Sequence, residues 1–223
     1  GHSLGEYSAL VANGCLGLSD AVSTVRKRGE FMQEAVPLGV GSMAAILGLE
    51  IGDVEEICGE ASRDSLIASP ANLNAPGQTV ISGNTEAVAK AAGLAKSRGA
   101  KRVVPLDVSA PVHCSLMEPA ARKLSEVLDS LTYSEMKAPV VTNCDASLNN
   151  DSAVVKELLV KQVVSPVRWY ESVQVLAGNG VSVFYEIGPK NVLSGLIKRT
   201  VDNATVANFE KTAHLESIKN GRK

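Results

Sequence analysis

The spacing of hydrophobic residues along the chain alternates between a helical and a strand period. From residue 4 to residue 13 apolar side chains recur at about one helical turn, and Gly14 follows as a C-terminal cap. A second helix is predicted from about Asp20 to Ala35, with Ser19 as its N-cap and Val36-Pro37 as its end. The chain therefore opens with two consecutive helices.

The inward stripe of the second helix contains a charge. Ala21, Val25, Arg28 and Met32 are spaced by four, three and four residues. Burying an arginine without a partner is unfavourable, so we expect Arg28 to face a carboxylate, a phosphate or a water-filled cleft. The alternative is a structural ion pair or a side chain that extends to solvent.

Residues 39–108 form a self-contained pattern that begins after the glycine-rich break at Gly39-Val40-Gly41. Its predicted elements are a strand at 42–49, a helix at 53–61, strands at 66–72 and 79–82, a helix at 84–98 and a strand at 101–108. The order β-α-β-β-α-β is that of a ferredoxin-like subdomain, inserted here into a larger unit.

The larger unit consists of residues 1–38 and 109–223. After residue 109 the pattern predicts a helix at 117–131, a β-rich run at 139–145, a helix capped by Asp151, a helix begun by Ser165-Pro166, a strand at 181–187 and a helix at 192–201. Alternating strands and helices predict an α/β layered core with a mostly parallel sheet. Gln162 extends an apolar helical stripe with an amide, and the last dozen residues are polar and predicted to be loose.

Composition limits the class of protein. The chain has 223 residues, of which 45% are hydrophobic, and a net charge of −2, which gives no support for a nucleic-acid or an anionic-membrane partner. No apolar run approaches the roughly 20 residues that span a bilayer. The four cysteines lack zinc-ligand spacing and C-x-x-C pairing, so reduced thiols in an intracellular compartment are expected.

The first five residues provide the candidate chemistry. Gly1-His2-Ser3-Leu4-Gly5 has the form G-x-S-x-G, in which a serine lies on a sharp strand-to-helix turn with its hydroxyl exposed. The helix predicted after it fits the second half of that context. No strand precedes Ser3 in this sequence, so we expect a chain truncated at its start.

A serine nucleophile needs a base, and the sequence offers three histidines. His2 adjoins Ser3 and is not expected to fold back onto it, and His214 lies in the polar tail. His113 follows a proline in a loop after a strand, where catalytic groups are commonly placed. We therefore predict His113 as the base, with a structural histidine as the alternative.

Several segments together carry a family resemblance. GHSLGEYSAL, RKRGEFMQEAVP, NLNAPGQTVISG, SAPVHCSLMEPA and FYEIGPKNVLSGL occur in this order over about the first 200 residues. In this respect the chain resembles the malonyl-CoA:acyl carrier protein transacylases of fatty-acid synthesis, and the free-standing bacterial type more than the domains of polyketide synthases. The resemblance implies an α/β-hydrolase-like core with an inserted ferredoxin-like subdomain.

The resemblance also implies roles for individual residues. Ser3 matches the acylated nucleophile and His113 its general base and acid. Arg28 matches the arginine that holds the malonyl carboxylate, Gln162 the position that helps orient the histidine, and Leu4 the donor of a backbone N–H to the oxyanion. The family's G-Q-G segment, which completes the oxyanion hole, lies upstream of the serine and is absent from this sequence.

The activity implied is transfer of malonyl from coenzyme A to the phosphopantetheine thiol of acyl carrier protein through a malonyl-serine ester. Malonyl-CoA and acyl carrier protein are then the partners of a monomer that needs no cofactor and no metal. Bacterial cytoplasm is the implied location, or a mitochondrion or plastid in a eukaryote. Two alternatives stay open: a serine esterase or thioesterase, which would usually take its histidine from near the C-terminus, here His214, and a truncated non-catalytic fragment.

Overall fold

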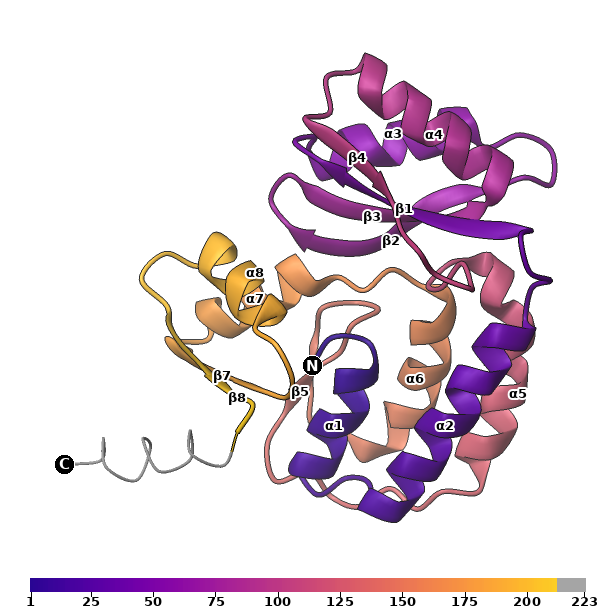
Figure 1. Ribbon diagram of the computed structural model, residues 1–223. Coiled ribbons are helices and arrows are strands. Elements are labelled where there is room, and N and C mark those ends of the chain that lie inside the picture. Colours follow the sequence, from indigo (N-terminus) through magenta and orange to yellow (C-terminus); the bar gives the residue numbers. More distant parts are fainter. Residues whose placement is uncertain (212–223) are drawn as a thin grey trace.

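The computed structural model of the protein describes residues 1–211 and has an α/β fold (Figure 1). The α-helices are α1 (Leu4–Ala12), α2 (Leu18–Glu34), α3 (Ile51–Ala61), α4 (Thr85–Ser97), α5 (Glu118–Asp129), α6 (Val155–Val164), α7 (Trp169–Gly178) and α8 (Val192–Thr200). The strands are β1 (Gly41–Leu47), β2 (Ala68–Ala75), β3 (Gln78–Asn84), β4 (Arg102–Pro105), β5 (Val140–Val141), β6 (Leu148–Asn149), β7 (Val183–Ile187) and β8 (Thr205–Phe209). Short 3-10 turns, η1 (Ser115–Met117) and η2 (Ser152–Val154), precede α5 and α6.

Strands β1 to β4 form one sheet, drawn at the top of Figure 1 with α3 and α4 packed against it. The strand order is β2-β3-β1-β4 and each neighbouring pair is antiparallel. The element order β-α-β-β-α-β is the one that the sequence predicts. Ile46, Ile57 and Ile81 are among the fully buried side chains that join the sheet to the two helices.

The mostly parallel sheet that the sequence predicts is not found in the described residues. Apart from a single parallel bridge between Asn72 and Val167, only β7 and β8 pair in parallel there, whereas the four-stranded sheet and the β5-β6 pair are antiparallel. Alternation of strands and helices does not reveal this difference. That prediction applied to the larger unit, where the described strands meet in two separate pairs, β5 with β6 and β7 with β8, and the order of elements along the chain does not specify which strands meet.

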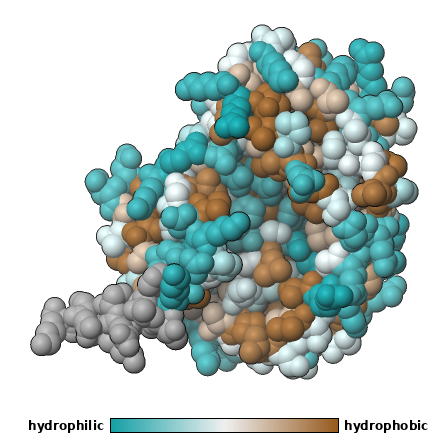
Figure 2. All heavy atoms as spheres, viewed as in Figure 1, coloured by the Kyte–Doolittle hydropathy of each residue, from teal (hydrophilic) through white to brown (hydrophobic). Residues whose placement is uncertain are grey.

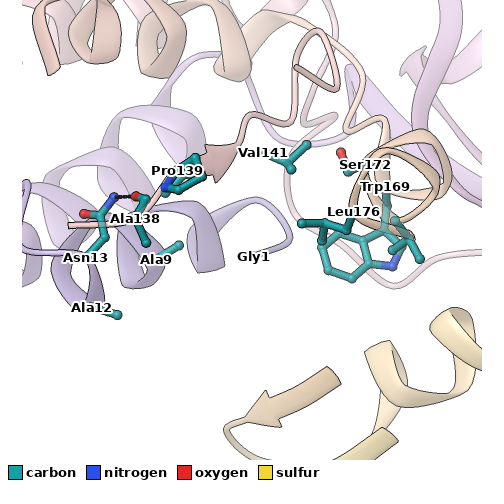
Figure 3. Close-up of a pocket in the computed structure, with 12 residues that line it drawn as sticks. Gly1, Ala9, Ala12, Asn13, Ala138, Pro139, Val141, Trp169, Ser172 and Leu176 are labelled. Atoms are coloured by element: carbon teal, nitrogen blue, oxygen red, sulfur yellow. Dashed lines mark hydrogen bonds between the residues drawn. The ribbon is translucent and has the colours of Figure 1, made fainter. Parts of the chain in front are cut away.

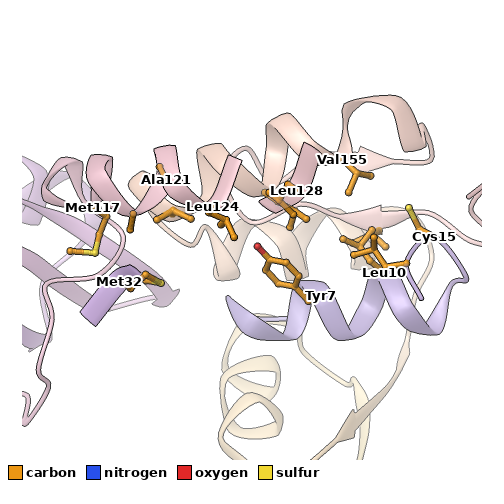
Figure 4. Packing of buried hydrophobic residues seen from close by; sticks show 14 of the residues in the cluster. Tyr7, Leu10, Cys15, Met32, Met117, Ala121, Leu124, Leu128 and Val155 are labelled. Carbon is orange, nitrogen blue, oxygen red and sulfur yellow. The ribbon is translucent and has the colours of Figure 1, made fainter. Parts of the chain in front are cut away.

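The helices α1, α2, α5 and α6 form a second layer below the sheet (Figure 1). Their shared core is apolar, and Figure 4 shows Tyr7 and Leu10 of α1 facing Leu124 and Leu128 of α5. A fully buried leucine contributes on the order of 1.5–3 kcal/mol relative to an exposed one, so this cluster fixes the position of α1. The first residue of α1 directly follows Ser3.

Three local predictions differ from the structure. Helix α2 begins at Leu18 with Gly17 as N-cap, because the Gly17 carbonyl accepts a hydrogen bond from the Ala21 N–H at 2.9 Å. Ser165-Pro166 does not begin a helix, since Val167 pairs with β2 and α7 starts at Trp169. Strand β8 was not predicted, and it pairs with β7 along its whole length.

Two further observations concern the state of the cysteines and the length of the helices. All four cysteines, Cys15, Cys58, Cys114 and Cys144, are buried and free of disulfides. Within residues 1–211, no helix is both long enough and apolar enough to span a membrane.

Candidate active site

Ser3 lies at a strained turn at the start of α1. Its φ is 49° and its ψ is −106°, a backbone conformation that L-residues rarely adopt. A Cβ on Gly1 would lie 2.0 Å from the carbonyl oxygen of Gly5, so the close approach at this turn requires a glycine at position 1. At Gly5 a Cβ would meet nothing within 4 Å, so the structure gives no steric reason for that glycine.

The imidazole of His113 lies beside the Ser3 hydroxyl. Ser3 Oγ and His113 Nε2 are 2.8 Å apart, and the His113 side chain is buried. His113 Nδ1 donates to the main-chain carbonyl of Gln162 at 2.9 Å. A carbonyl only accepts, so Nδ1 carries the proton and Nε2 is left to accept the proton of the hydroxyl.

The environment keeps this imidazole neutral. Burial, followed by the nearby positive charge of Arg28, lowers the pKa of His113 from 6.5 to about 3. The hydrogen bond from Nδ1 to the Gln162 carbonyl opposes this shift but does not outweigh burial. At neutral pH His113 is therefore a proton acceptor and not a cation.

Arg28 reaches the same hydroxyl from α2. Its Nη2 donates to Ser3 Oγ at 2.9 Å and to the side-chain oxygen of Gln162 at 3.0 Å. The guanidinium carbon lies 5.8 Å from the centre of the Tyr7 ring, within the range of a cation–π contact. Arg28 is 6% exposed and forms no ion pair within the described part of the chain, so a buried cation beside the nucleophile has no anion paired with it.

Gln162 contacts the histidine through its main chain. Its main-chain carbonyl, and not its side-chain amide, accepts from the imidazole. The side-chain oxygen accepts from Arg28, and Nε2 donates to the Ser3 carbonyl at 3.1 Å and to Glu6 Oε2 at 2.8 Å. The amide therefore connects the nucleophile's main chain, the arginine and a carboxylate.

The N–H of Leu4 is the first of the α1 helix and lies directly after the nucleophile. The next two N–H groups are used, since Gly5 donates to the His2 carbonyl and Glu6 to the Ser3 carbonyl. An N–H in the first helical turn has no acceptor within the helix. The Leu4 N–H is therefore placed to donate to an external oxygen.

His2 contacts other residues than this cluster. His2 Nε2 lies 3.0 Å from Asn74 Oδ1, and its ring packs 5.6 Å from the ring of Trp169. The prediction that His2 does not fold back onto Ser3 is therefore confirmed. His214 lies outside the described residues.

Sequence reasoning missed Glu6 and Asn143. Asn143 Oδ1 accepts from the Ser3 N–H at 2.6 Å, and its Nδ2 donates to the Gly1 carbonyl at 2.9 Å. Both side chains are 1% exposed. The available signal was a polar residue in an otherwise apolar run, Asn143 after Val140-Val141 and Glu6 on the helix face of Leu10.

A cavity of about 380 Å³ opens beside His113. Residues of β2, of the segment after β4 and of the end of α6 line it, among them Ser69, Pro70, Ser115 and Val164. Another hollow, about 370 Å³ in volume, lies between α1 and α7, and Figure 3 shows Ala9, Trp169 and Leu176 around it. Ser3 lines neither of the two, and His113 lines only the first, so the cavity beside His113 is the one that adjoins the candidate base.

The polar cluster contrasts with the surface around it. Figure 2 shows hydrophobic side chains gathered over α1 and α2 on the lower part of this face. Leu4, Leu18 and Val22 are more than half exposed there.

Comparison with known proteins identifies the family. A sequence model described as "Acyl transferase domain" matches residues 1–222. The chain belongs to this acyl transferase family. It is 48% identical over 217 residues to the malonyl CoA-acyl carrier protein transacylase of Salmonella typhimurium, a match that covers 97% of this chain and 70% of the relative. To the protein of the same description from Bacillus subtilis it is 52% identical over 199 residues, covering 89% of this chain and 63% of the relative.

Solved structures of acyl transferases share the fold. A malonyl CoA-acyl carrier protein transacylase from Coxiella burnetii superimposes with a TM-score of 0.94 at 44% identity, over 98% of this chain and 69% of that one. A malonyl-transacylase solved in complex with a type II PKS acyl-carrier protein gives a TM-score of 0.96 at 44% identity, over 100% of this chain and 72% of that one. The chain thus spans about two thirds of the length of these acyl transferases.

Proposed function

We propose that the protein transfers a malonyl group from coenzyme A to the phosphopantetheine thiol of acyl carrier protein in fatty-acid biosynthesis. One observation carries the proposal: Ser3 Oγ lies 2.8 Å from a neutral imidazole nitrogen and 2.9 Å from a buried guanidinium nitrogen. The first contact suits a nucleophile, and the second suits an acyl group that ends in a carboxylate. The descriptions of the relatives from Salmonella typhimurium and Bacillus subtilis support the same substrates.

The first half-reaction forms an ester on Ser3. Ser3 Oγ attacks the thioester carbonyl carbon while His113 Nε2 takes the hydroxyl proton. The carbonyl oxygen becomes an oxyanion, which we assign to the Leu4 N–H as one of its donors. The C–S bond then breaks, and the imidazolium returns its proton to the sulfur of coenzyme A.

The second half-reaction runs in the opposite sense. The carrier protein's thiol gives its proton to His113 as its sulfur attacks the malonyl-serine carbonyl carbon. The C–O bond to Ser3 breaks and Ser3 Oγ regains the proton. The chain's own groups supply every proton transfer, so the proposed reaction needs neither cofactor nor metal, and it follows ping-pong kinetics.

Arg28 is the proposed determinant of the acyl group. A planar guanidinium binds a carboxylate through two parallel N–H bonds, and an acetyl group offers it no such partner. Because the site is built to hydrogen-bond this carboxylate, an acyl group that lacks it leaves the buried polar atoms unpaired.

We infer that the site lies between two units. Residues 39–108 would be a ferredoxin-like subdomain, which the strand order β2-β3-β1-β4 supports, inserted into an α/β-hydrolase-like core of residues 1–38 and 109–223. The cavity beside His113 is lined from both parts of the chain, which supports placing the thioester there.

Intact-mass measurement after mixing with malonyl-CoA tests the proposal. We expect one malonyl adduct, located on Ser3 by peptide mapping, and its loss when the acyl carrier protein carrying a free phosphopantetheine thiol is added. The matched control is Ser3→Ala, which should form no adduct. Folded wild-type chain that forms no adduct would contradict the proposal.

The esterase alternative differs in its histidine and in its acceptor. Loss of activity in His214→Ala with retention in His113→Ala would favour it, as would release of free malonate without transfer to the thiol. The 2.8 Å contact between Ser3 Oγ and His113 Nε2 favours the transferase, because His113 is the histidine next to the nucleophile, whereas an esterase would usually take its histidine from near the C-terminus.

A further inference from the structure

Glu6 is a buried carboxylate within the hydrogen-bond network of the site. It lies in the first turn of α1 and is 1% exposed. Its Oε2 accepts from Gln162 Nε2 at 2.8 Å and from the Asn143 N–H at 3.0 Å. Its partners are thus an amide side chain and a main-chain N–H. No ion pair involving Glu6 is found among residues 1–211.

The contact with Glu6 decides which way the Gln162 amide faces. A carboxylate accepts and does not donate, so the Gln162 NH₂ group must face Glu6 and its oxygen must face Arg28. In the reversed orientation the Gln162 oxygen would meet the carboxylate, and its NH₂ group would meet the Arg28 Nη2. Both contacts would then be unfavourable, one between two acceptors and one between two donors.

The Gln162 amide in turn decides where the guanidinium lies. The described acceptors of Arg28 Nη2 are Gln162 Oε1 and Ser3 Oγ. Without the first acceptor, the guanidinium would be held only by the nucleophile itself and by the Tyr7 ring. A buried donor that loses its acceptor is destabilised, so the arginine would move to find another.

The second hydrogen bond of Glu6 reaches the nucleophile by a separate route. Asn143, whose N–H donates to Glu6, accepts the Ser3 N–H through its side chain. Glu6 thus contacts both the group that holds Arg28 and the group that holds the main chain of Ser3.

We propose that Glu6 is a positioning residue that acts through Gln162 to hold the Arg28 guanidinium beside Ser3, and so sets the preference for an acyl group ending in a carboxylate. The inference rests on the proposed malonyl transfer. It extends that function by assigning selectivity to a residue that touches neither substrate nor nucleophile side chain.

Three substitutions of Glu6 separate the effect of the acceptor's position from the effect of its negative charge. Both hydrogen bonds end on the same oxygen of Glu6, so Glu6→Gln can keep both through its carbonyl oxygen while removing the charge. Glu6→Asp keeps the charge but withdraws the acceptor by one methylene. Glu6→Ala removes both the acceptor and the charge.

The readout is the ratio of kcat/KM for malonyl-CoA to that for acetyl-CoA in acylation of Ser3. We expect Glu6→Ala and Glu6→Asp to lower the ratio by about 10-fold, equivalent to about 1.4 kcal/mol, and Glu6→Gln to keep it within about 3-fold. The loss should appear mainly with malonyl-CoA, because acetyl-CoA makes no use of the guanidinium.

The matched control is Asn13→Ala at the other end of α1. Asn13 is also buried, and its side chain makes two hydrogen bonds, to the Ala138 carbonyl and from the Cys15 N–H, outside the site. Asn13→Ala should lower the melting temperature and leave the selectivity ratio unchanged. If Glu6→Ala does not fold, Glu6→Asp and Glu6→Gln still decide between position and charge.

Two results would overturn the inference. A ratio retained in Glu6→Asp and lost in Glu6→Gln would show that the charge matters and the position does not. An equal fall in Asn13→Ala and the Glu6 variants would show a general effect of weakening α1. Absence of any malonyl adduct in the wild-type chain would instead refute the proposed function, whereas an adduct with wild-type selectivity in Glu6→Ala refutes only the role of Glu6.

Discussion

Two regions of the molecule differ in the side chains that they bury. One is the four-stranded sheet with its two helices, and the other is the group of polar side chains around Ser3, called here the Ser3 cluster. Within residues 41–105 the buried side chains are mostly apolar, and no charged side chain is buried there. The Ser3 cluster buries Glu6, Arg28, His113 and Gln162 together. Desolvating such groups is unfavourable, so this cluster adds little to stability, but it holds hydrogen-bond donors and acceptors in fixed positions for reaction.

Substitution of the base should give the largest effect on catalysis. We expect His113→Ala to slow acylation of Ser3 by about 10⁴-fold or more, because the hydroxyl then has no acceptor for its proton. The melting temperature should also fall, because the substitution leaves a cavity and an unpaired Gln162 carbonyl, so the rate is compared at a temperature at which the variant is folded. Single-turnover acylation followed by mass spectrometry measures the rate, and a rate within 10-fold of wild type would remove His113 from the base's role.

The corresponding substitution in the sheet region should affect stability instead. Ile57→Ala removes a fully buried side chain from the core between α3 and the sheet. The free energy of unfolding should fall by about 2–5 kcal/mol, as is usual for such cavities, and the ratio of malonyl to acetyl transfer should stay at the wild-type value. Urea unfolding and the transfer assay on the same preparation test both halves, and an altered ratio would mean that the two regions are coupled.

Selectivity should respond to Arg28 by a smaller factor than rate responds to His113. We expect Arg28→Ala to shift the ratio of kcat/KM toward acetyl-CoA by about 10- to 100-fold, since a hydrogen bond to a charged group is worth about 1.5–3 kcal/mol. The ratio in Arg28→Lys should lie between those of the wild-type chain and Arg28→Ala, because lysine keeps the charge without the planar guanidinium. An unchanged ratio in Arg28→Ala would place the carboxylate elsewhere.

The same contrast explains what could be read from the sequence. The order of elements in residues 41–105 follows local rules, so periodicity predicts it. Periodicity also singles out Arg28 and Gln162, since each interrupts an apolar stripe. The mostly parallel sheet predicted for the larger unit is not found in the described residues, because the contacts that pair β5 with β6 and β7 with β8 are not specified by the alternation of elements along the chain.

The site was partly predictable for a related reason. Ser3 follows from a short motif and His113 from elimination among three histidines. Asn143 and Glu6 contribute through contacts across 137 positions or more, and neither lies in a pattern that specifies its partner. The sequence also could not predict the hydrogen bond between His113 and the main-chain carbonyl of Gln162, because no pattern of side chains indicates which carbonyl faces an imidazole.

The dependence of stability on pH should distinguish the two regions least strongly of all. The pKa of His113 is lowered from 6.5 to about 3, so between these values the folded state binds fewer protons than the unfolded chain. The stabilisation is complete above pH 6.5 and is lost as the pH falls toward 3. Glu6 acts in the opposite sense: burial raises its pKa above 4.5, so its contribution is present below that pH and is lost as the pH rises.

Urea unfolding at about pH 7 and about pH 5 measures this slope. We expect His113→Gln to lose less stability than the wild-type chain between the higher and the lower pH, because glutamine does not titrate. Part of the slope should remain in that variant, since burial also lowers the pKa of His2. Ile57→Ala should lower stability equally at both pH values, because no histidine lies within residues 41–105. A full wild-type slope in His113→Gln would show that the buried imidazole is not its source, and the distinction between an aliphatic core and a titrating one would then fail.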